Sequence, residues 1–329
     1  MLWSFVDDEN EDPFRKGVFD YLKFVFGLSA IAEHTLSTHK IFCLLKHFHN
    51  TTYSFQIWTL YRTMVNSSHI IAPIEGPYTH TIIFLHGRDS IAPEFAVELF
   101  ESQASDNRTL REKFPTVKWI FPGSKFRDSA RFDTQMSQWF DIWSVENPLE
   151  REEIQKEGLQ ESVGEIIDII RKEASLIPPE QIILGGISQG CATAIYALLC
   201  GGIRFGGFVG LCSWMPFQND IAALVSKSEG DNAAKLIRDF LNEGVDGAAG
   251  VRDLSHLSQN PALETPIFLS HSQDDGIVPI SNGEELSRLL AGLGLSVVWK
   301  SYEDGGHWIN EPQGLDDIVY FLQNECGLK

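Results

Sequence analysis

Basic residues are scarce in this chain. Lysine and arginine number 26 against 45 aspartates and glutamates, so the formal net charge is −19 over 329 residues. Proteins bind phosphate backbones and anionic membrane surfaces through basic patches. The shortage of lysine and arginine therefore argues against a nucleic-acid partner. With 43% hydrophobic and 22% charged residues, the composition is that of a globular protein, which excludes a disordered or collagenous chain.

Cysteine is also sparse, and no pair has Cys-x-x-Cys or Cys/His ligand spacing. The odd-numbered set is Cys43, Cys191, Cys200, Cys212 and Cys326. This pattern supports neither a disulfide framework nor a zinc site. We therefore expect no bound metal and a reducing compartment, the cytoplasm.

A secretion signal and a membrane span are both lacking. The acidic run from Asp7 to Asp12 is opposite in charge to the basic start of a signal peptide. The apolar stretch from Val18 to Ala32 contains Asp20 and Lys23, and is shorter than the roughly 20 apolar residues that a transmembrane helix requires. We expect no stable span, with peripheral membrane contact through this stretch as the remaining membrane hypothesis.

Residues 1–75 differ from the rest and are interpreted as an N-terminal extension of uncertain structure. They are rich in aromatic residues and carry a group of histidines, His34, His39, His47 and His49, without a clear strand pattern. Only His47 and His49 are close in sequence, which is weak support for a metal site. An extra layer, a membrane-contacting helix and a poorly ordered extension remain the alternatives.

From Thr79 onward, predicted strands and helices alternate in a single domain, assigned to residues 76–329. Apolar β-branched runs predict strands at 81–85, 117–121, 181–184, 205–211, 266–270 and 297–302. Apolar residues at helical spacing predict helices at 93–100, 160–176, 191–199, 283–293 and 315–322. This order predicts an α/β fold, with a mostly parallel sheet and helices on both faces. Residues 226–262 break the alternation and are expected to form an excursion outside the sheet.

The strongest chemical signal is the pentapeptide Gly186-Ile187-Ser188-Gln189-Gly190. It lies between a predicted strand and a predicted helix, where small flanking residues permit a strained serine with an exposed oxygen. The motif predicts Ser188 as a nucleophile. A glycine-rich structural turn with an incidental serine is the alternative.

A serine nucleophile needs a histidine base and a carboxylate, in the chain order Ser, Asp, His for this motif. Asp275 and His307 each follow a predicted strand. Loops after parallel strands gather at one edge of the sheet, so these side chains are expected to approach Ser188. Asp274 is the alternative acid. His271 is the alternative base, although it precedes the acid and breaks the order.

Acyl transfer also needs N–H donors for the oxyanion of its tetrahedral intermediate. One donor is ordinarily the backbone N–H after the nucleophile, here Gln189, and the second comes from the loop after an early strand, here Arg88. His86, two residues before Arg88, is interpreted as a structural histidine beside the site.

Several separate motifs together resemble the phospholipase/carboxylesterase family, which contains the acyl-protein thioesterases. In the family's order they are Leu85-His86-Gly87, 137–142, 185–190, 212–216, 275–279 and 305–307. The resemblance covers residues 78–325 and implies that 76–329 is an α/β-hydrolase catalytic domain with a Ser188, Asp275 and His307 triad and no cofactor. It also makes His86, Trp139 and Trp214 candidates for the substrate cleft, with packing in the core as the alternative for the tryptophans.

The expected activity is therefore that of an acyl-protein thioesterase-like serine hydrolase, which acts on acyl esters or thioesters, including those of S-acylated proteins. A general short-chain carboxylesterase or lysophospholipase is the alternative, and a non-catalytic hydrolase-fold binding protein comes after it. Arg88-Asp89 departs from the family, which usually has an apolar residue and then glycine after His-Gly. Asp89 tolerates a left-handed backbone better than most residues, so the loop can be preserved.

Overall fold

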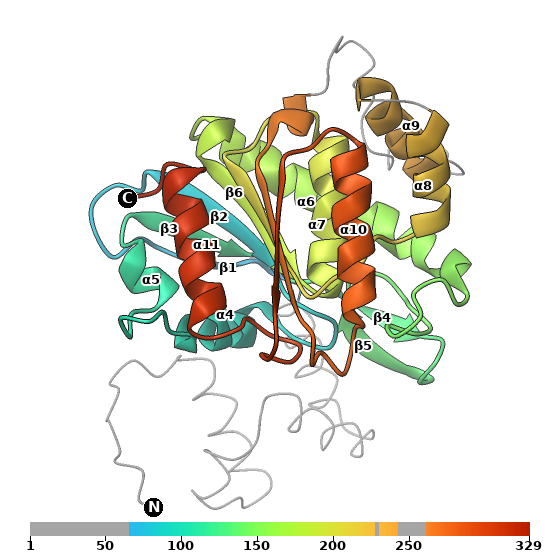
Figure 1. Cartoon of the computed structure of the whole chain (residues 1–329), viewed down its shortest axis with the longest axis horizontal. Helices are drawn as coiled ribbons and strands as arrows, with labels where there is room; N and C mark the ends of the chain where they lie inside the picture. The colour runs from blue at the N-terminus through green and yellow to red at the C-terminus, as the bar shows by residue number, and fades with distance from the viewer. Residues whose placement is uncertain (1–65, 228–229, 243–260) are drawn as a thin grey trace, which may run out of the picture. The chain divides into compact units, whose positions relative to one another are not determined.

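The centre of the protein is a mostly parallel β-sheet (Figure 1). The structure is a computed structural model that describes residues 66–227, 230–242 and 261–329. Within these residues seven strands pair in the order β1-β3-β2-β6-β7-β8-β9, and only β1 runs antiparallel to its neighbour. The strands are β1 (His69–Ile71), β2 (His80–Leu85), β3 (Val117–Phe121), β6 (Ile182–Ile187), β7 (Gly207–Leu211), β8 (Ile267–Ser272) and β9 (Val297–Tyr302).

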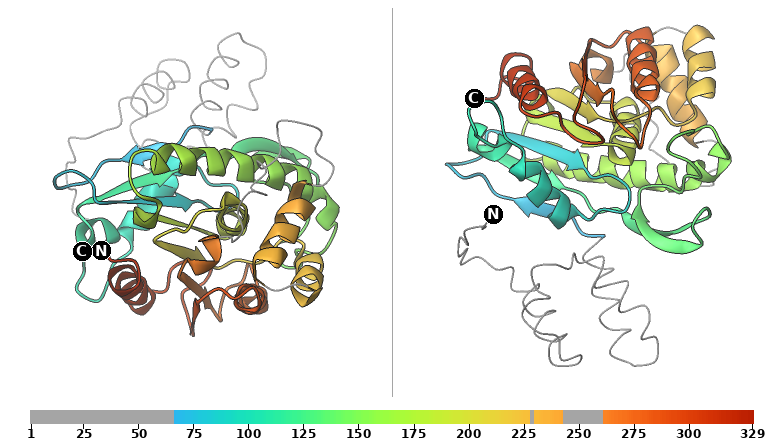
Figure 2. Two further views of the ribbon diagram at one scale, coloured as in Figure 1. Left: turned by 90° about the horizontal axis from the view of Figure 1, so that it is seen from above. Right: turned by 60° about the horizontal axis from the view of Figure 1, so that its bottom comes forward.

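Helices cover both faces of this sheet (Figure 2). On one face lie α6 (Lys156–Ala174), α7 (Gln189–Gly201) and α10 (Ile280–Gly292). On the same side, α8 (Gln218–Lys227) and α9 (Gly230–Asn242) pack against these helices. The other face packs against α4 (Ala92–Glu101), α5 (Leu110–Lys113) and α11 (Gln313–Asn324). In β2, Ile83 and Leu85 face the first layer while Ile82 and Phe84 face the second, which explains its uninterrupted apolar sequence. The predicted α/β-hydrolase fold class is confirmed.

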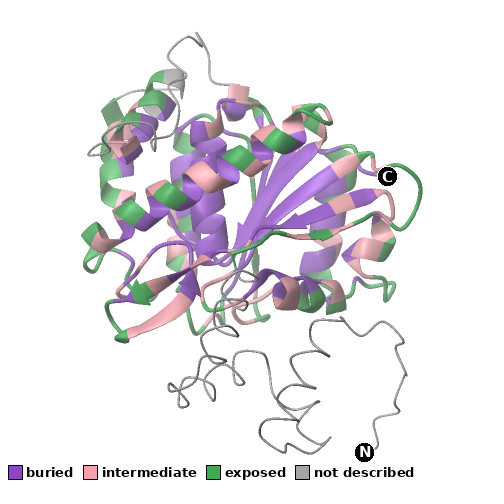
Figure 3. Cartoon of the chain, turned by 180° about the vertical axis from the view of Figure 1, so that it is seen from behind, coloured by how far each residue is buried: buried purple, intermediate pink, exposed green. Residues whose placement is uncertain are grey.

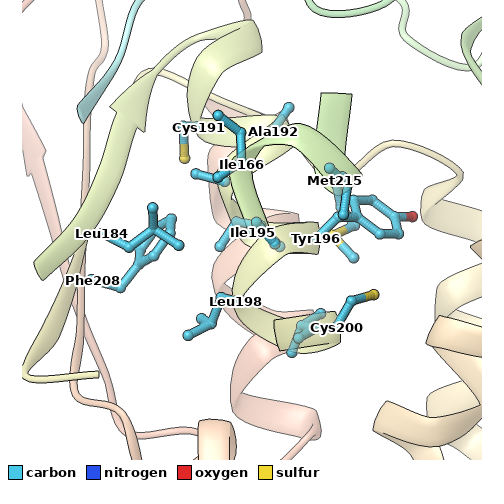
Figure 4. Close-up of a cluster of buried hydrophobic side chains, with 14 of the residues drawn as sticks. Ile166, Leu184, Cys191, Ala192, Ile195, Tyr196, Leu198, Cys200, Phe208 and Met215 are labelled. Carbon is cyan, nitrogen blue, oxygen red and sulfur yellow. The ribbon is translucent and has the colours of Figure 1, made fainter. Parts of the chain in front are cut away.

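Helix α7 lies in the interior, and nearly all of its side chains are buried. A helix that is apolar on all sides belongs in the core of a large domain. In Figure 4, Ile195 and Leu198 extend toward Leu184 and Phe208 of the sheet, while Tyr196 lies on the other side of the helix. The Tyr196 hydroxyl donates to the Pro216 carbonyl oxygen at 2.8 Å, which satisfies its buried polar group. Figure 3 shows the same arrangement: buried residues fill the central strands and the helix packed against them, while exposed residues lie on the outer helices.

Two strand features were not predicted. Strand β1 lies inside the segment interpreted as the N-terminal extension, so the sheet begins seven residues before position 76. It is a three-residue edge strand, too short to produce a readable period-2 pattern. The strands β4 (Lys125–Ser129) and β5 (Thr134–Gln138) form a separate antiparallel hairpin, and their polar sequences hide the alternation that predicts a strand.

Several predictions concern residues that the structure does not describe or describes in part. The four N-terminal histidines, Cys43 and the stretch 18–32 all lie outside the described residues. Of the excursion at 226–262, the described part is helical: α9 buries Ala234, Ile237 and Leu241, and no strand occurs in the portions of this stretch that the structure describes. None of the described helices is both long enough and apolar enough to span a bilayer.

Candidate active site

Ser188 occupies a strained turn between β6 and α7. Its backbone angles are φ 56° and ψ −128°, outside the regions that L-amino acids ordinarily adopt. The end of β7 holds it there. The Ser188 N–H donates to the Leu211 carbonyl at 2.9 Å, and the Ser188 carbonyl accepts from the Ser213 hydroxyl at 2.8 Å.

The two glycines of the pentapeptide are required by close packing against the end of β2. A Cβ atom at Gly190 would lie 2.4 Å from the carbonyl oxygens of both Leu85 and His86. A Cβ atom at Gly186 would lie 2.8 Å from the Leu85 oxygen. On the other side of the turn, a Cβ atom at Gly87 would lie 3.6 Å from the Ser188 Cβ. The loop after β2 therefore flanks the serine, as the oxyanion-donor hypothesis for Arg88 requires.

Asp275 and His307 are in direct contact. The His307 Nδ1 lies 2.7 Å from the Asp275 Oδ2, and the backbone N–H groups of Ile277 and Val278 donate to Oδ1 at 2.9 Å each. Burial alone would raise the pKa of Asp275, but hydrogen bonds from His271, His307 and Val278 hold that pKa well below its ordinary value. The carboxylate is therefore ionised at neutral pH.

The two alternatives left open by the sequence lie beside this pair. Asp274 is exposed and accepts a hydrogen bond from the Gly306 N–H at 2.8 Å, which supports the loop before His307. His271 is fully buried, and its Nε2 lies 3.0 Å from the same Asp275 oxygen that contacts His307. His307 retains 17% side-chain exposure, so it is the histidine of the two that solvent reaches.

The serine turn and the His307 loop are joined through the end of β7. Ser188 binds the Leu211 carbonyl, and the thiol of the next residue, Cys212, donates to the Trp308 carbonyl at 3.4 Å. Strands β6, β8 and β9 are parallel members of one sheet, and Ser188, Asp275 and His307 each follow the carboxyl end of one of them. Such an edge is where α/β proteins build their sites.

The side chain of Gln189 ties the start of α7 to the segment after β5, a contact that the sequence did not reveal. Its Oε1 accepts from the Trp139 N–H at 2.9 Å, and its Nε2 donates to the Phe140 carbonyl at 2.7 Å. The Asp89 N–H in turn donates to the Ser137 carbonyl at 2.7 Å, with Asp89 at φ 62°. The left-handed backbone expected for Asp89 is present, and both proposed donor loops are fixed to the same segment.

The three candidates for the substrate cleft, His86, Trp139 and Trp214, occupy buried positions, in line with the alternative of core packing for the two tryptophans. All three side chains are buried in the core, with at most 1% exposure. The His86 Nδ1 donates to the Gly87 carbonyl at 2.7 Å and its Nε2 accepts from the Ser124 N–H at 3.2 Å, while the Trp139 indole donates to the His86 carbonyl at 2.8 Å. Because their polar atoms find partners inside the protein, His86 and Trp139 support the loop after β2 without reaching solvent.

Comparison with known proteins agrees with this architecture. The model of the phospholipase/carboxylesterase family matches residues 66–237, more than half of the chain. The chain belongs to the phospholipase/carboxylesterase family. Its predicted enzyme class, a serine hydrolase, is confirmed at the level of the family.

Individual relatives of this phospholipase/carboxylesterase family member carry thioesterase names. The chain is 30% identical over 262 residues to acyl-protein thioesterase 1 of Gibberella zeae, which covers 78% of this chain and 94% of the relative. It is 27% identical to acyl-protein thioesterase 1 of Yarrowia lipolytica, over 76% of this chain and 94% of the relative. The fold resembles that of Zea mays acyl-protein thioesterase 2, with a TM-score of 0.57 at 21% identity over 80% of this chain and all of that chain. Arabidopsis thaliana SOBER1 gives a TM-score of 0.55 at 22% identity, over 75% and 98%.

The Arg88 side chain, the departure from the phospholipase/carboxylesterase family pattern, turns toward the β4–β5 hairpin. Its guanidinium donates to the Ile142 carbonyl at 3.3 Å and lies 5.4 Å from the ring centroid of Phe132, an exposed residue between the two strands. Arg131 lies against the same ring at 5.5 Å. The Arg88 side chain thus contacts the hairpin through a cation–π interaction. The backbone N–H of Arg88 remains the hypothesised oxyanion donor.

The four cysteines that the structure describes do not compete with Ser188 as nucleophiles. In the part of the chain that the structure describes, Cys191, Cys200, Cys212 and Cys326 are unpaired and buried. Burial raises the pKa of the Cys191, Cys200 and Cys326 thiols to about 12 and that of Cys212 still further, so the reactive thiolate is scarce at neutral pH.

Cys212, His271 and Asp275 approach one another closely enough to suggest a cation site. The His271 Nε2 faces two oxygen acceptors, however, so it carries a proton and is not a free ligand.

Acid is expected to destabilise this phospholipase/carboxylesterase family member through His86. Burial lowers the pKa of His86 from 6.5 to about 4, against the hydrogen bond to Gly87 that opposes the shift. Between these two pH values the unfolded chain binds a proton that the folded protein excludes, so stability falls as the pH falls. The loss reaches about 3 kcal/mol near pH 4. Urea unfolding at pH 7 and pH 4.5 measures it.

The matched variant is His86→Asn, whose amide can still donate toward Gly87. The difference in unfolding free energy between pH 7 and pH 4.5 should be smaller in this variant than in the wild type, because carboxylates that titrate in the same window are common to both. Equal pH dependence in the two proteins would show that His86 is not the responsible group.

Proposed function

We propose that this protein is an acyl-protein thioesterase-like serine hydrolase that cleaves fatty acyl thioesters or esters with Ser188, His307 and Asp275. The single observation that carries the proposal is the 2.7 Å contact between the His307 Nδ1 and the ionised Asp275, in the loops beside a strained serine. Two relatives that the chain matches over 94% of their length are named acyl-protein thioesterase 1, and these names support the choice of substrate class. The cytoplasm, where S-acylated proteins present such bonds, is the proposed compartment.

In the proposed mechanism, the Ser188 hydroxyl attacks the acyl carbonyl carbon while the His307 Nε2 takes its proton. Asp275 accepts the His307 Nδ1–H and stabilises the imidazolium that forms. The tetrahedral oxyanion accepts hydrogen bonds from the backbone N–H groups of Arg88 and Gln189. Collapse of the intermediate breaks the carbon–sulfur or carbon–oxygen bond, and His307 returns the proton to the leaving group. Water, deprotonated by His307, then releases the fatty acid and regenerates Ser188.

A fluorophosphonate probe tests the nucleophile, because it labels only an activated serine. The wild type is expected to be labelled at Ser188, as mapped by mass spectrometry of its peptides, and urea-denatured wild type should remain unlabelled. The Ser188→Ala variant should show no labelling and no hydrolysis of p-nitrophenyl esters. Folded wild type that resists the probe would instead support a non-catalytic binding protein.

An acyl chain-length series tests the substrate class. Matched thioesters and oxygen esters with chains from acetyl to palmitoyl are compared by kcat/KM in the wild type. A thioesterase of lipidated proteins should favour long chains, because each buried methylene adds about 0.8 kcal/mol to binding. A maximum at short chains would favour the general carboxylesterase.

A further inference from the structure

The Asp275 carboxylate has a second imidazole partner, His271, which the proposed mechanism does not use. In the described part of the chain, Asp275 accepts four hydrogen bonds: Oδ1 from the backbone N–H groups of Ile277 and Val278, and Oδ2 from His271 and His307. The His271 and His307 nitrogens lie 3.0 and 2.7 Å from that shared oxygen. We propose that His271 is a positioning residue that fixes the Asp275 carboxylate for His307, an inference that rests on the proposed triad.

The hydrogen-bond geometry specifies where His271 carries its proton. Its Nε2 lies 3.0 Å from the Asp275 Oδ2 and 2.9 Å from the Val278 carbonyl oxygen, and neither oxygen can donate. Nε2 therefore bears the hydrogen. The other nitrogen, Nδ1, is buried and finds no hydrogen-bond partner in the described residues, and a Cβ atom at Gly283 would lie only 2.5 Å from it. A second proton there would be an unpartnered buried charge, so the neutral Nε2–H tautomer is the one that fits.

A neutral N–H donor at this position has a different electrostatic effect on Asp275 from that of a lysine or arginine. It anchors Oδ2 without cancelling the charge of the carboxylate, so Asp275 keeps its negative charge for the imidazolium of His307. The same N–H also contacts the Val278 carbonyl, while the Val278 N–H binds Oδ1. His271 thereby locks the side chain of Asp275 and the loop that follows it into one unit, set by packing against Gly283.

Loss of this donor should affect the chemical step more than substrate binding. With Oδ1 held by two backbone groups, the second oxygen would keep only His307, and the carboxylate would be less well oriented toward it. Residues that orient the ligands of a metal site typically cost 10- to 100-fold in activity when they are replaced, and we expect a loss of the same order for this orienting residue. An interaction of this kind lowers kcat and leaves KM nearly unchanged.

The test compares His271→Leu with His271→Gln in the full-length protein, using kcat and KM for p-nitrophenyl esters. His271→Leu is expected to lower kcat about 10- to 100-fold, whereas the Gln amide can restore an N–H donor near the position of Nε2 and should recover most of that loss. His80→Leu is the matched control, since His80 lies at the start of β2, at the opposite end of the strand from the active-site loop, with its Nδ1 3.1 Å from the Thr79 hydroxyl. This variant should keep the wild-type kcat. Wild-type kcat in His271→Leu would overturn the proposal, as would an equal loss in the Gln variant at equal melting temperature.

A double-mutant cycle keeps the proposal testable even if the leucine variant folds poorly. His271→Asn, whose amide is too short to reach Oδ2, is combined with Asp275→Asn. If His271 acts through the Asp275 carboxylate, its replacement should have little further effect on kcat once that carboxylate is gone. Additive losses would show a separate structural role and overturn the inference. Fluorophosphonate labelling of Ser188→Ala would refute the proposed nucleophile instead, so the two failures are distinguishable.

Discussion

Replacement of Asp275 by asparagine is expected to lower kcat roughly 10⁴-fold. The four donors around this side chain are the reason. A carboxylate accepts from all four, but an amide has one oxygen and one NH₂ group, so one pair of donors must face another donor. The backbone N–H groups of Ile277 and Val278 cannot change, so the amide oxygen turns to them and its NH₂ faces the imidazoles. His307 would then move its proton to Nε2, where it cannot accept the proton of Ser188.

Asp274 provides the matched control for this prediction. It is adjacent in sequence, carries the same charge and contacts the Gly306 N–H, which an asparagine oxygen can still accept. Asp274→Asn should change kcat by no more than about twofold, the range of an exposed substitution. Steady-state kinetics on both variants, with urea unfolding to verify their folding, give the comparison. Similar losses in the two variants would assign the effect to local charge and reject Asp275 as the orienting carboxylate.

Gly190→Ala is expected to destabilise the fold by more than about 3 kcal/mol, beyond the usual cost of overpacking. The new Cβ atom would lie 2.4 Å from two backbone oxygens and 2.6 Å from the Leu85 carbonyl carbon. Backbone atoms cannot rotate away as a side chain can, so α7 or the end of β2 must shift. That shift would also move the loop of Gly87 relative to Ser188 and abolish fluorophosphonate labelling of whatever protein remains folded.

Gly164→Ala is the control for a glycine in a helix. Gly164 lies in α6 with open space where the Cβ would be, and the substitution should stabilise the protein by about 0.5 to 1 kcal/mol. Urea unfolding of both variants measures the contrast. Wild-type stability in Gly190→Ala would mean that the turn does not pack as tightly against β2 as the distances indicate.

The buried parts of the fold could be predicted because they have a physical periodicity. Strands β3 and β9 match the predicted ranges residue for residue, and β6 differs mainly in running three residues farther, to Ile187. Apolar runs mark strands that are covered on both faces, and the glycine spacing around Ser188 marks a turn that no larger residue can make.

The supporting contacts could not be predicted, because they depend on tertiary structure. Gln189 occupies a position of the pentapeptide that places no demand on the backbone, and its partners lie 49 and 50 residues away in sequence. His86 and Trp139 looked like cleft residues because they stand beside the motifs, yet their polar atoms are satisfied inside. His271 did leave a signal: its i, i+4 spacing to Asp275 allows contact across one turn of loop, but the sequence alone presented it as a rival to His307.

The parallel order of the strands also determines when a growing chain can acquire activity. The strained turn at Ser188 lies at the end of β6, which pairs with β2, and the end of β7 accepts the Ser188 N–H. His307 follows β9, the last strand, so a ribosome has made Ser188 and Asp275 well before the proposed base exists. Domains fold progressively during synthesis, and contacts between distant segments form late. A nascent chain would therefore lack the proposed triad until β9 and the loop that carries His307 have been synthesised, which would delay its hydrolase activity.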